Sequence, residues 1–321
     1  MTLDQAQKIL LIAPHRLGDT LFATPGIRVL RQAKPKAQID ALPLSRLSYE
    51  VLKNNSCIDK IYHPDLEYLK KITNEYEIIL PLQNIKKINS FLQNTENVLM
   101  LPRYSGSYHY SENFYRFIQK NLQCAKQFSL GEYELNFSEE DEIAVKKLLN
   151  NVPSDAYLIA LHMGCHKIAK GPNVLSKIFP FLTTTNSRSW SFKRFNQLIQ
   201  KLLKTYPKIH IILTGSDTER YASESLLPHS RLLNFMGLTN VTQLAALLSR
   251  CKLLLTGDTG PMHVASAVNL PMVLLCGETN PNETGPHPQK AHHTIIYKKG
   301  MKNISVEETY DAIQKNIKIF N

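Results

Sequence analysis

Residues 252–286 of the sequence read KLLLTGDTGPMHVASAVNLPMVLLCGETNPNETGP. A short apolar run at 253–255 predicts a β-strand, and a turn rich in Gly, Asp and Thr follows it. Pro261 favours the first position of a helix, because its missing N–H has no helical partner to lose there. A second apolar run at 272–275 and a polar loop complete the stretch. It therefore predicts one repeat of an α/β fold, with its functional edge at the turn.

The turn itself suggests an anion site. Asp258 and Thr259 are residue types that cap helices, and Gly260 allows a tight turn. A helix that begins here directs free N–H groups and the positive end of its dipole outward, which suits a diphosphate. His263, in the first turn, can add a further donor. Taken singly, these residues are explained by capping and packing. Together with a second loop that contains Gly277 and Thr279, they favour a binding site.

The rest of the chain repeats the pattern of short apolar segments alternating with helical or polar ones. The expected strands are 8–13, 38–41, 58–62, 78–82, 97–101, 157–161, 209–213, 253–255 and 272–275. Such alternation predicts doubly wound parallel sheets. A chain of 321 residues fits two domains, and the turn residues at 150–155 suggest the linker. We therefore expect an N-terminal domain at 1–152, a C-terminal domain at 153–304 and a final helix at 305–321.

Net charge and cysteine content indicate which partners and which cellular compartment to expect. The net charge of +11 calls for an anionic partner, but the basic residues are dispersed and form no nucleic-acid-binding motif. An anionic membrane surface, or a phosphorylated glycolipid within it, explains the charge better, with a solvated basic surface as the alternative. Five scattered cysteines indicate a reducing cytoplasm without disulfides. The N-terminus is expected to form the first strand rather than a signal peptide, and no apolar run is long enough to span a membrane.

Residues 258–281, DTGPMHVASAVNLPMVLLCGETNP, resemble the C-terminal signature of the ADP-heptose:lipopolysaccharide heptosyltransferases, which are family 9 glycosyltransferases. The resemblance implies a GT-B fold, in which two Rossmann-like domains face a cleft. It also implies transfer of heptose from ADP-heptose to the lipopolysaccharide core at the cytoplasmic face of the inner membrane. In such folds the final helix commonly packs back on the N-terminal domain.

The resemblance extends to the first strand and its loop, where residues 16–25 read RLGDTLFATP. Asp19 is similar to the catalytic aspartate of the family, which takes the proton of the acceptor hydroxyl. The alternative is a helix N-cap. Arg16, Gly18 and Thr20 are then expected to contact the acceptor.

The same resemblance assigns the donor site. Asp258, Thr259, Gly260 and His263 would hold the diphosphate of ADP, and Gly277 and Thr279 would complete the nucleotide wall. Family members place a lysine before a helix, where this chain has Arg188 after an insertion that contains Lys170, so either cation could meet the diphosphate. Glu219, with Ser216 nearby, matches a ribose-contacting glutamate. No Asp-x-Asp motif occurs, and we expect neither a metal nor another cofactor to be required.

Three functions compete for this pattern. The first is an inverting heptosyltransferase, and another nucleotide sugar is possible on the same fold. The second is a nicotinamide-dependent oxidoreductase, which predicts a Gly-x-Gly-x-x-Gly turn after the first strand. Residues 14–19 read PHRLGD and do not fit it. The third is a catalytically silent nucleotide-sugar-binding protein, which would not need Asp19.

Overall fold

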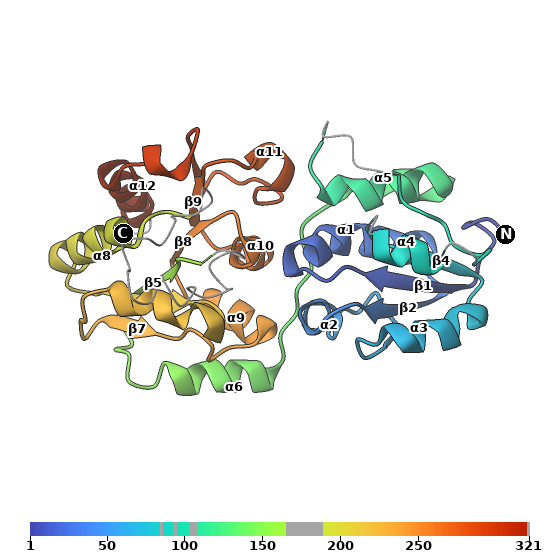
Figure 1. Cartoon of the computed structure of the whole chain (residues 1–321), viewed down its shortest axis with the longest axis horizontal. Coiled ribbons are helices and arrows are strands. Elements are labelled where there is room, and N and C mark those ends of the chain that lie inside the picture. The colour runs from blue at the N-terminus through green and yellow to red at the C-terminus, as the bar shows by residue number, and fades with distance from the viewer. Residues whose placement is uncertain (84–85, 93–94, 103–107, 165–188, 320–321) are drawn as a thin grey trace. The chain divides into compact units, whose positions relative to one another are not determined.

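The computed structural model describes residues 1–83, 86–92, 95–102, 108–164 and 189–319. The chain divides into two compact units, Met1–Ser138 and Glu139–Asn321. Each unit is built on a parallel β-sheet with helices packed against it (Figure 1). The α/β class expected from the alternating apolar segments is confirmed.

The first unit holds a four-stranded sheet in the order β3-β2-β1-β4. Its strands are β1 (Lys8–Ala13), β2 (Gln38–Pro43), β3 (Lys60–Ile61) and β4 (Ile78–Pro81). The segment 97–101 was expected to be a strand, but it makes a single parallel bridge between Val98 and Ile79. The chain runs from β1 outward to β3 and then crosses to the other side of β1. The carboxyl ends of β1 and β4 therefore form a topological switch point, where ligands of such sheets bind.

Five α-helices accompany this sheet in the described part of the first unit: α1 (Leu17–Ala33), α2 (Arg46–Leu52), α3 (Leu66–Ile72), α4 (Lys86–Leu92) and α5 (Ser111–Asn121). Helix α1 begins two residues before Asp19 and continues through Pro25. Because Pro25 has no N–H, the carbonyl of Leu21 loses its helical donor. The Thr24 hydroxyl donates to that carbonyl instead, at 2.9 Å.

The second unit holds a six-stranded sheet in the order β10-β9-β8-β5-β6-β7. Its strands are β5 (Tyr157–His162), β6 (Ile209–Thr214), β7 (Leu232–Asn234), β8 (Leu253–Gly257), β9 (Met272–Cys276) and β10 (His293–Tyr297). Every pairing is parallel. The chain runs from β5 to β7 and then crosses to β8 on the other side of β5. This sheet therefore has its switch point between β5 and β8.

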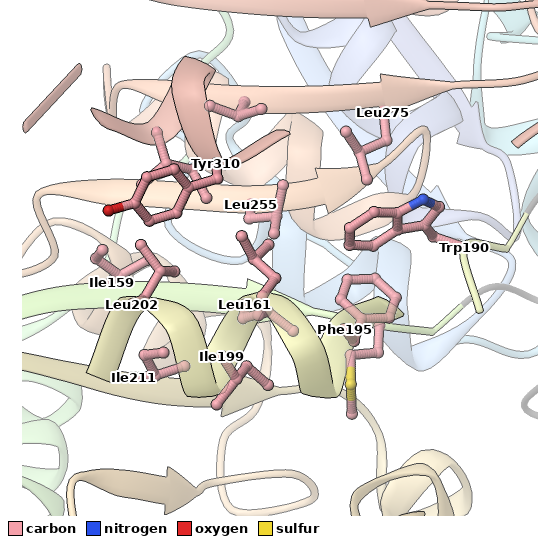
Figure 2. Packing of buried hydrophobic residues seen from close by; sticks show 14 of the residues in the cluster. Ile159, Leu161, Trp190, Phe195, Ile199, Leu202, Ile211, Leu255, Leu275 and Tyr310 are labelled. Carbon is pink, nitrogen blue, oxygen red and sulfur yellow. The ribbon is translucent and has the colours of Figure 1, made fainter. Parts of the chain in front are cut away.

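The described helices of the second unit are α6 (Glu139–Leu148), α8 (Phe192–Thr205), α9 (Val241–Leu248), α10 (Gly260–Ala267), α11 (Pro281–Thr284) and α12 (Val306–Ile319). One face of α8 packs on the sheet with α12 beside it, as Figure 2 shows for Phe195, Ile199 and Leu202. Helices α9 and α10 pack on each other, and α6 packs on α9.

The domain boundary differs from the expected one. Helix α6 belongs to the second unit, where Arg250 forms an ion pair with Glu142, so the boundary lies after Ser138 rather than at residue 152. The turn at 150–155 joins α6 to β5 within one unit. Helix α12 packs on α8 and β9 of its own unit, and the packing of the final helix on the N-terminal domain stays a prediction. A helix packs where its apolar face becomes buried, and the turn residues at 150–155 did not reveal that α6 is buried against the second unit.

Trp190 anchors the start of α8. Its indole is buried, lies edge-on to Phe195 with ring centroids 5.0 Å apart, and donates from Nε1 to the Ile304 carbonyl at 2.9 Å. Trp190 is therefore a core residue that fixes the start of α8. None of the helices in the described ranges combines the length and hydropathy needed to cross a membrane.

We predict that Trp190→Phe lowers the free energy of unfolding of the second unit by about 2–4 kcal/mol, because it removes buried volume and leaves the Ile304 carbonyl without its donor. Guanidinium denaturation followed by circular dichroism measures the change.

Tyr157→Phe is the matched control. The hydroxyl of Tyr157 is buried without a hydrogen-bond partner, so its removal takes away an unsatisfied group. We expect this variant to be neutral or slightly stabilising. Equal destabilisation by both substitutions would contradict the importance of the indole hydrogen bond.

Candidate functional site

The predicted donor residues within the described ranges all follow strands β6, β8 and β9 at the carboxyl edge of the second sheet. They are Ser216 and Glu219 after β6, Asp258, Thr259, Gly260 and His263 after β8, and Gly277 and Thr279 after β9. Strands β8 and β9 are neighbours, and β5 lies between β8 and β6. The fold thus brings to one edge residues that lie far apart in the sequence.

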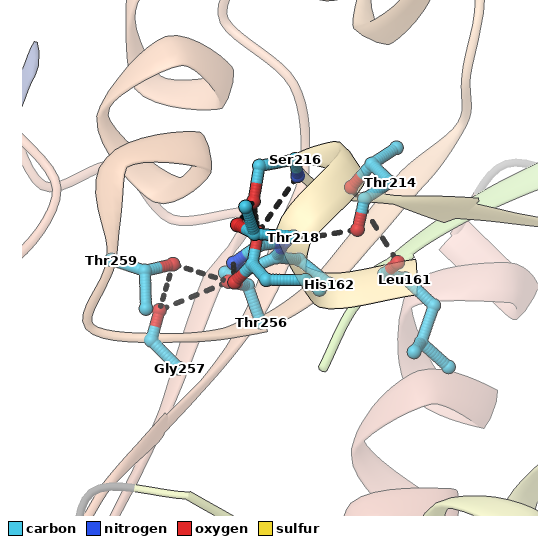
Figure 3. A network of polar contacts seen from close by, with 9 residues as sticks. Leu161, His162, Thr214, Ser216, Thr218, Thr256, Gly257 and Thr259 are labelled. Atoms are coloured by element: carbon cyan, nitrogen blue, oxygen red, sulfur yellow. Dashed lines mark hydrogen bonds and ion pairs between the residues drawn. The ribbon is translucent and has the colours of Figure 1, made fainter. Parts of the chain in front are cut away.

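The turn between β8 and α10 leaves the helix without a side-chain cap. Thr259 has the extended backbone of an N-cap residue, but its hydroxyl makes no capping hydrogen bond. It donates to the Gly257 carbonyl at 3.3 Å and lies 3.1 Å from the hydroxyl of Thr256 (Figure 3). The N-cap side chain therefore satisfies none of the first-turn amides of α10, and the positive end of the helix dipole there favours an anion.

Asp258 ties this turn to the next loop. Its Oδ2 accepts a hydrogen bond from the Thr284 hydroxyl at 2.9 Å, at the end of α11. Both side chains are half-buried. Sequence reasoning did not single out Thr284, although it lies within the polar loop that follows β9. Asp258 therefore connects two loops of the site instead of capping α10.

His263 lies in the first turn of α10 and is buried. Burial lowers the pKa of His263 to about 4, against the opposing effect of the Asp258 charge. The imidazole is therefore neutral at pH 7. It can donate an N–H, as the sequence suggested, but it brings no positive charge to the site.

Ser216 and Glu219 form a compact pair at the end of β6. Glu219 Oε2 accepts from both the amide and the hydroxyl of Ser216, each at 2.7 Å, and the two residues form a capping box for the 3₁₀ segment Asp217–Ser225. The carboxylate of Glu219 is nearly buried. These residues thus have a structural function in addition to any contact with a ligand.

Of the remaining donor candidates, Gly277 and Thr279 lie in the loop that follows β9. The carbonyl of Gly277 accepts from the Gly300 amide at 2.7 Å, which holds the β9 loop against the segment after β10. Burial and the charge of Asp258 raise the pKa of the Cys276 thiol to about 12, and the side chain of Thr279 acts in the opposite direction. Lys170 and Arg188 lie outside the described residues.

Asp19 occupies the switch point of the first sheet. It follows β1 in the first turn of α1 and is half-buried. Burial raises the pKa of Asp19 above its ordinary value, while a hydrogen bond from Gln83 and the charge of Arg16 act in the opposite direction. A carboxylate with a raised pKa is a stronger base at neutral pH than the unperturbed group that the sequence implied.

Gln83 was not predicted. It follows β4, whose Pro81 pairs with Ile12 of β1, so the two strand ends bring Gln83 next to Asp19. Strand order alone decides this neighbourhood, since the two residues are far apart in the sequence.

The three residues expected to contact the acceptor are not equivalent. Arg16 is exposed at the N-cap position of α1, and Gly18 is half-buried beside Asp19. Thr20 is fully buried, and its hydroxyl donates to the Arg16 carbonyl at 2.9 Å. Its side chain therefore holds the β1–α1 turn, and the acceptor contacts of Arg16, Gly18 and Thr20 stay predictions.

Within the described ranges, no three His, Cys, Asp or Glu side chains are grouped so that they could hold a metal ion.

A sequence profile described as Glycosyltransferase family 9 (heptosyltransferase) matches residues 78–313. The chain belongs to this family. It is a glycosyltransferase of the heptosyltransferase group, and the family resemblance of residues 258–281 is confirmed.

Family 9 relatives cover nearly the whole chain. The lipooligosaccharide heptosyltransferase 2 of Haemophilus ducreyi is 23% identical over 97% of this chain and 94% of its own length. Among solved structures, a family 9 glycosyltransferase from Veillonella parvula has a TM-score of 0.79 at 18% identity, covering 99% of both chains. The Escherichia coli ADP-heptose LPS heptosyltransferase II has a TM-score of 0.77 at 18% identity, covering 97% of this chain and 99% of that one. These structures show that the fold of this family 9 enzyme is GT-B.

The buried His263 generates a prediction on pH. In the unfolded chain a histidine has a pKa near 6.5, so between about pH 6.5 and 4 the unfolded state binds a proton that the folded state does not. Stability should therefore fall as the pH falls through this range, by on the order of 3 kcal/mol from this residue.

The measurement compares urea denaturation of the wild type and His263→Gln from pH 7.5 to 4. We expect the variant to lose less stability over this range than the wild type. His293→Gln is a parallel test outside the proposed donor site, because burial, with the neighbouring His292 and Lys290, also lowers the pKa of His293 to about 4. A pH dependence that is unchanged in His263→Gln would contradict the neutral, buried imidazole.

Proposed function

We propose that this family 9 enzyme transfers heptose from ADP-heptose to the core of lipopolysaccharide with inversion at the anomeric carbon. Family membership supports heptose transfer, and the Escherichia coli structural relative is named for ADP-heptose. The observation that carries the donor assignment is the uncapped start of α10 at the β5–β8 switch point.

The leaving diphosphate is the group that needs stabilisation, because negative charge grows on it as the glycosidic bond to the donor breaks. The first-turn amides of α10 and an N–H of His263 are the described donors for this charge. Asp258 holds the surrounding loops through Thr284. We assign the accompanying cation to Lys170 or Arg188, and the nucleoside to Ser216, Glu219, Gly277 and Thr279.

Asp19 supplies the base. In a single displacement, the acceptor oxygen bonds to the anomeric carbon while the bond from that carbon to the diphosphate oxygen breaks. The acceptor proton passes to the Asp19 carboxylate, and the electron pair leaves with ADP. The raised pKa of Asp19 strengthens it as a base. The proposed base lies in the first unit and the proposed donor site in the second.

The acceptor proposal rests on charge. The chain carries a net charge of +11, and Arg16 is exposed beside Asp19. A phosphorylated glycolipid at the cytoplasmic face of the inner membrane is an anionic partner that matches both features. We propose peripheral contact with that surface, and no role for nucleic acid.

We further propose that no metal or other cofactor is required, since the helix dipole and one cation can offset the charge of the diphosphate. The expected result is equal activity in EDTA and in magnesium. Loss of activity in EDTA that a divalent metal restores would overturn this part of the proposal.

The first test is ligand stabilisation, because it needs no acceptor. We expect ADP and ADP-heptose to raise the melting temperature, with UDP and GDP much weaker. A ligand at one hundred times its Kd adds about 2.7 kcal/mol to the stability of the folded state. Asp258→Asn should lose most of this effect, since it weakens the link between the two loops.

Asp19→Asn is the matched control, because it makes the same charge change in the other unit. We expect it to keep the stabilisation by ADP. Stabilisation by UDP or GDP alone would indicate another nucleotide sugar, and no response to any nucleotide would contradict the donor site.

Turnover tests the base. Asp19→Asn should lower kcat by about 100- to 10,000-fold with the Kd of ADP unchanged, the effect expected for loss of a general base. Activity in the wild type should fall as the pH drops through the raised pKa of Asp19.

Gln83→Ala should move that loss of activity to higher pH, because the hydrogen bond from Gln83 lowers the pKa of Asp19 and its removal raises it. The pH profiles of kcat/KM for both enzymes measure the change. A shift to lower pH would show that Gln83 does not stabilise the carboxylate.

A further inference from the structure

His162 lies at the carboxyl end of β5, beside the switch point of the second sheet. Strand register places it opposite Thr214 on β6. On the other side, Leu161 pairs with Leu255 of β8, so the next residue on β8 is Thr256. His162 thus stands between the turn that carries Glu219 and the turn that carries Thr259. Sequence reasoning did not select it.

The ring of His162 is held in one orientation. Nδ1 lies 3.0 Å from the carbonyl oxygen of Thr214, within the network drawn in Figure 3. A carbonyl oxygen only accepts, so Nδ1 carries a proton and donates it. This bond directs the other nitrogen, Nε2, to within 3.9 Å of Glu219 Oε1. At that separation the two atoms form no hydrogen bond, and they attract each other as an ion pair only when the imidazole is protonated on both nitrogens.

The carboxylate of Glu219 is thereby bounded on both oxygens. Oε2 accepts two hydrogen bonds from Ser216, and Oε1 faces His162. The backbone of Gly164 also borders Oε1: a Cβ there would lie 1.7 Å from Oε1 and 3.1 Å from Cε1 of His162. Only glycine therefore fits this position without displacing the carboxylate. Three residues from two strand ends define where Oε1 lies.

The burial of His162 indicates a role beyond hydrophobic packing. The side chain is 4% exposed, at a position where an apolar residue would pack without the desolvation that an imidazole suffers. The two groups that its nitrogens approach are the end of β6 and the carboxylate of the following turn. Both nitrogens of His162 therefore face the end of β6 and the turn that carries Glu219.

We propose that His162 is a positioning residue of the donor site, which holds Oε1 of Glu219 in place to accept a hydrogen bond from the 2′-hydroxyl of the donor nucleotide's ribose. This inference rests on the ribose contact of Glu219 in the proposed function. A carboxylate fixed before binding accepts the hydroxyl without an ordering penalty, so it contributes more to affinity.

The test compares the affinities for ADP and 2′-deoxy-ADP by calorimetry. A hydrogen bond to a charged group corresponds to a preference for ADP of about 10- to 100-fold in the wild type. His162→Asn keeps an amide near Nδ1 but ends short of Glu219, and we expect it to lose most of the preference. His162→Gln reaches the position of Nε2 and should retain much of it. Melting temperatures establish that both variants fold.

Two controls separate the outcomes. His210→Gln changes a half-buried histidine of β6 whose Nδ1 lies near the Lys208 carbonyl, and it should leave the preference unchanged. Glu219→Gln should abolish the preference. If the wild type shows none, the ribose contact in the proposed function is wrong and the role of His162 falls with it. If Glu219→Gln abolishes the preference but His162→Asn keeps it, only the role of His162 is overturned.

A purely structural role has its own signature. His162→Asn would then lower the affinities for ADP and 2′-deoxy-ADP equally, and this result overturns the proposal. An equal loss of the preference for ADP in His162→Asn and His162→Gln also overturns it. Should His162→Asn fail to fold, Gly164→Ala displaces Oε1 while His162 is retained. We expect it to lower the preference for ADP, and an unchanged preference would overturn the proposal.

Discussion

The parallel pairing of β5 with both β6 and β8 is the constraint on which the second unit depends. Parallel strands present all their carboxyl ends at one edge, and a chain that reverses its direction of sheet growth leaves a crevice there. Because β5 lies at this reversal, the turns after β6 and β8 are held on either side of His162. The first sheet repeats the arrangement on a smaller scale, with β1 and β4 bringing Asp19 and Gln83 together.

Many polar groups at these edges serve the protein as well as the proposed substrate. The hydroxyl of Thr259 binds the carbonyl of its own turn, and it satisfies none of the first-turn amides of α10. Glu219 both closes a capping box and presents a carboxylate oxygen toward His162. Such sites are preorganised, because the bonds that shape them are already present before a ligand arrives.

Burial shifts the pKa values of His263 and Asp19 in opposite directions. It keeps His263 neutral, so the proposed donor site relies on dipoles and on a cation from elsewhere for positive charge. It raises the pKa of Asp19, which improves a carboxylate as a base. Desolvation disfavours the charged form in both cases, and the outcome differs because one group is a base when charged and the other when neutral.

Local pattern in the sequence was enough to predict most of the parallel strands, the helix that starts near Pro261 and the family, because hydrophobic periodicity and turn residues act over a few neighbours. The expected strand at 97–101 reduces to one bridge, and β7 and β10 were not predicted, since short edge strands carry little periodic signal. The boundary after Ser138, the packing of α12, and the pairs Asp19–Gln83, Asp258–Thr284 and His162–Glu219 were decided by tertiary structure. Each depends on which strand ends lie next to each other and on which apolar faces bury together, and strand order in a parallel sheet is not written in the spacing of residues along the chain.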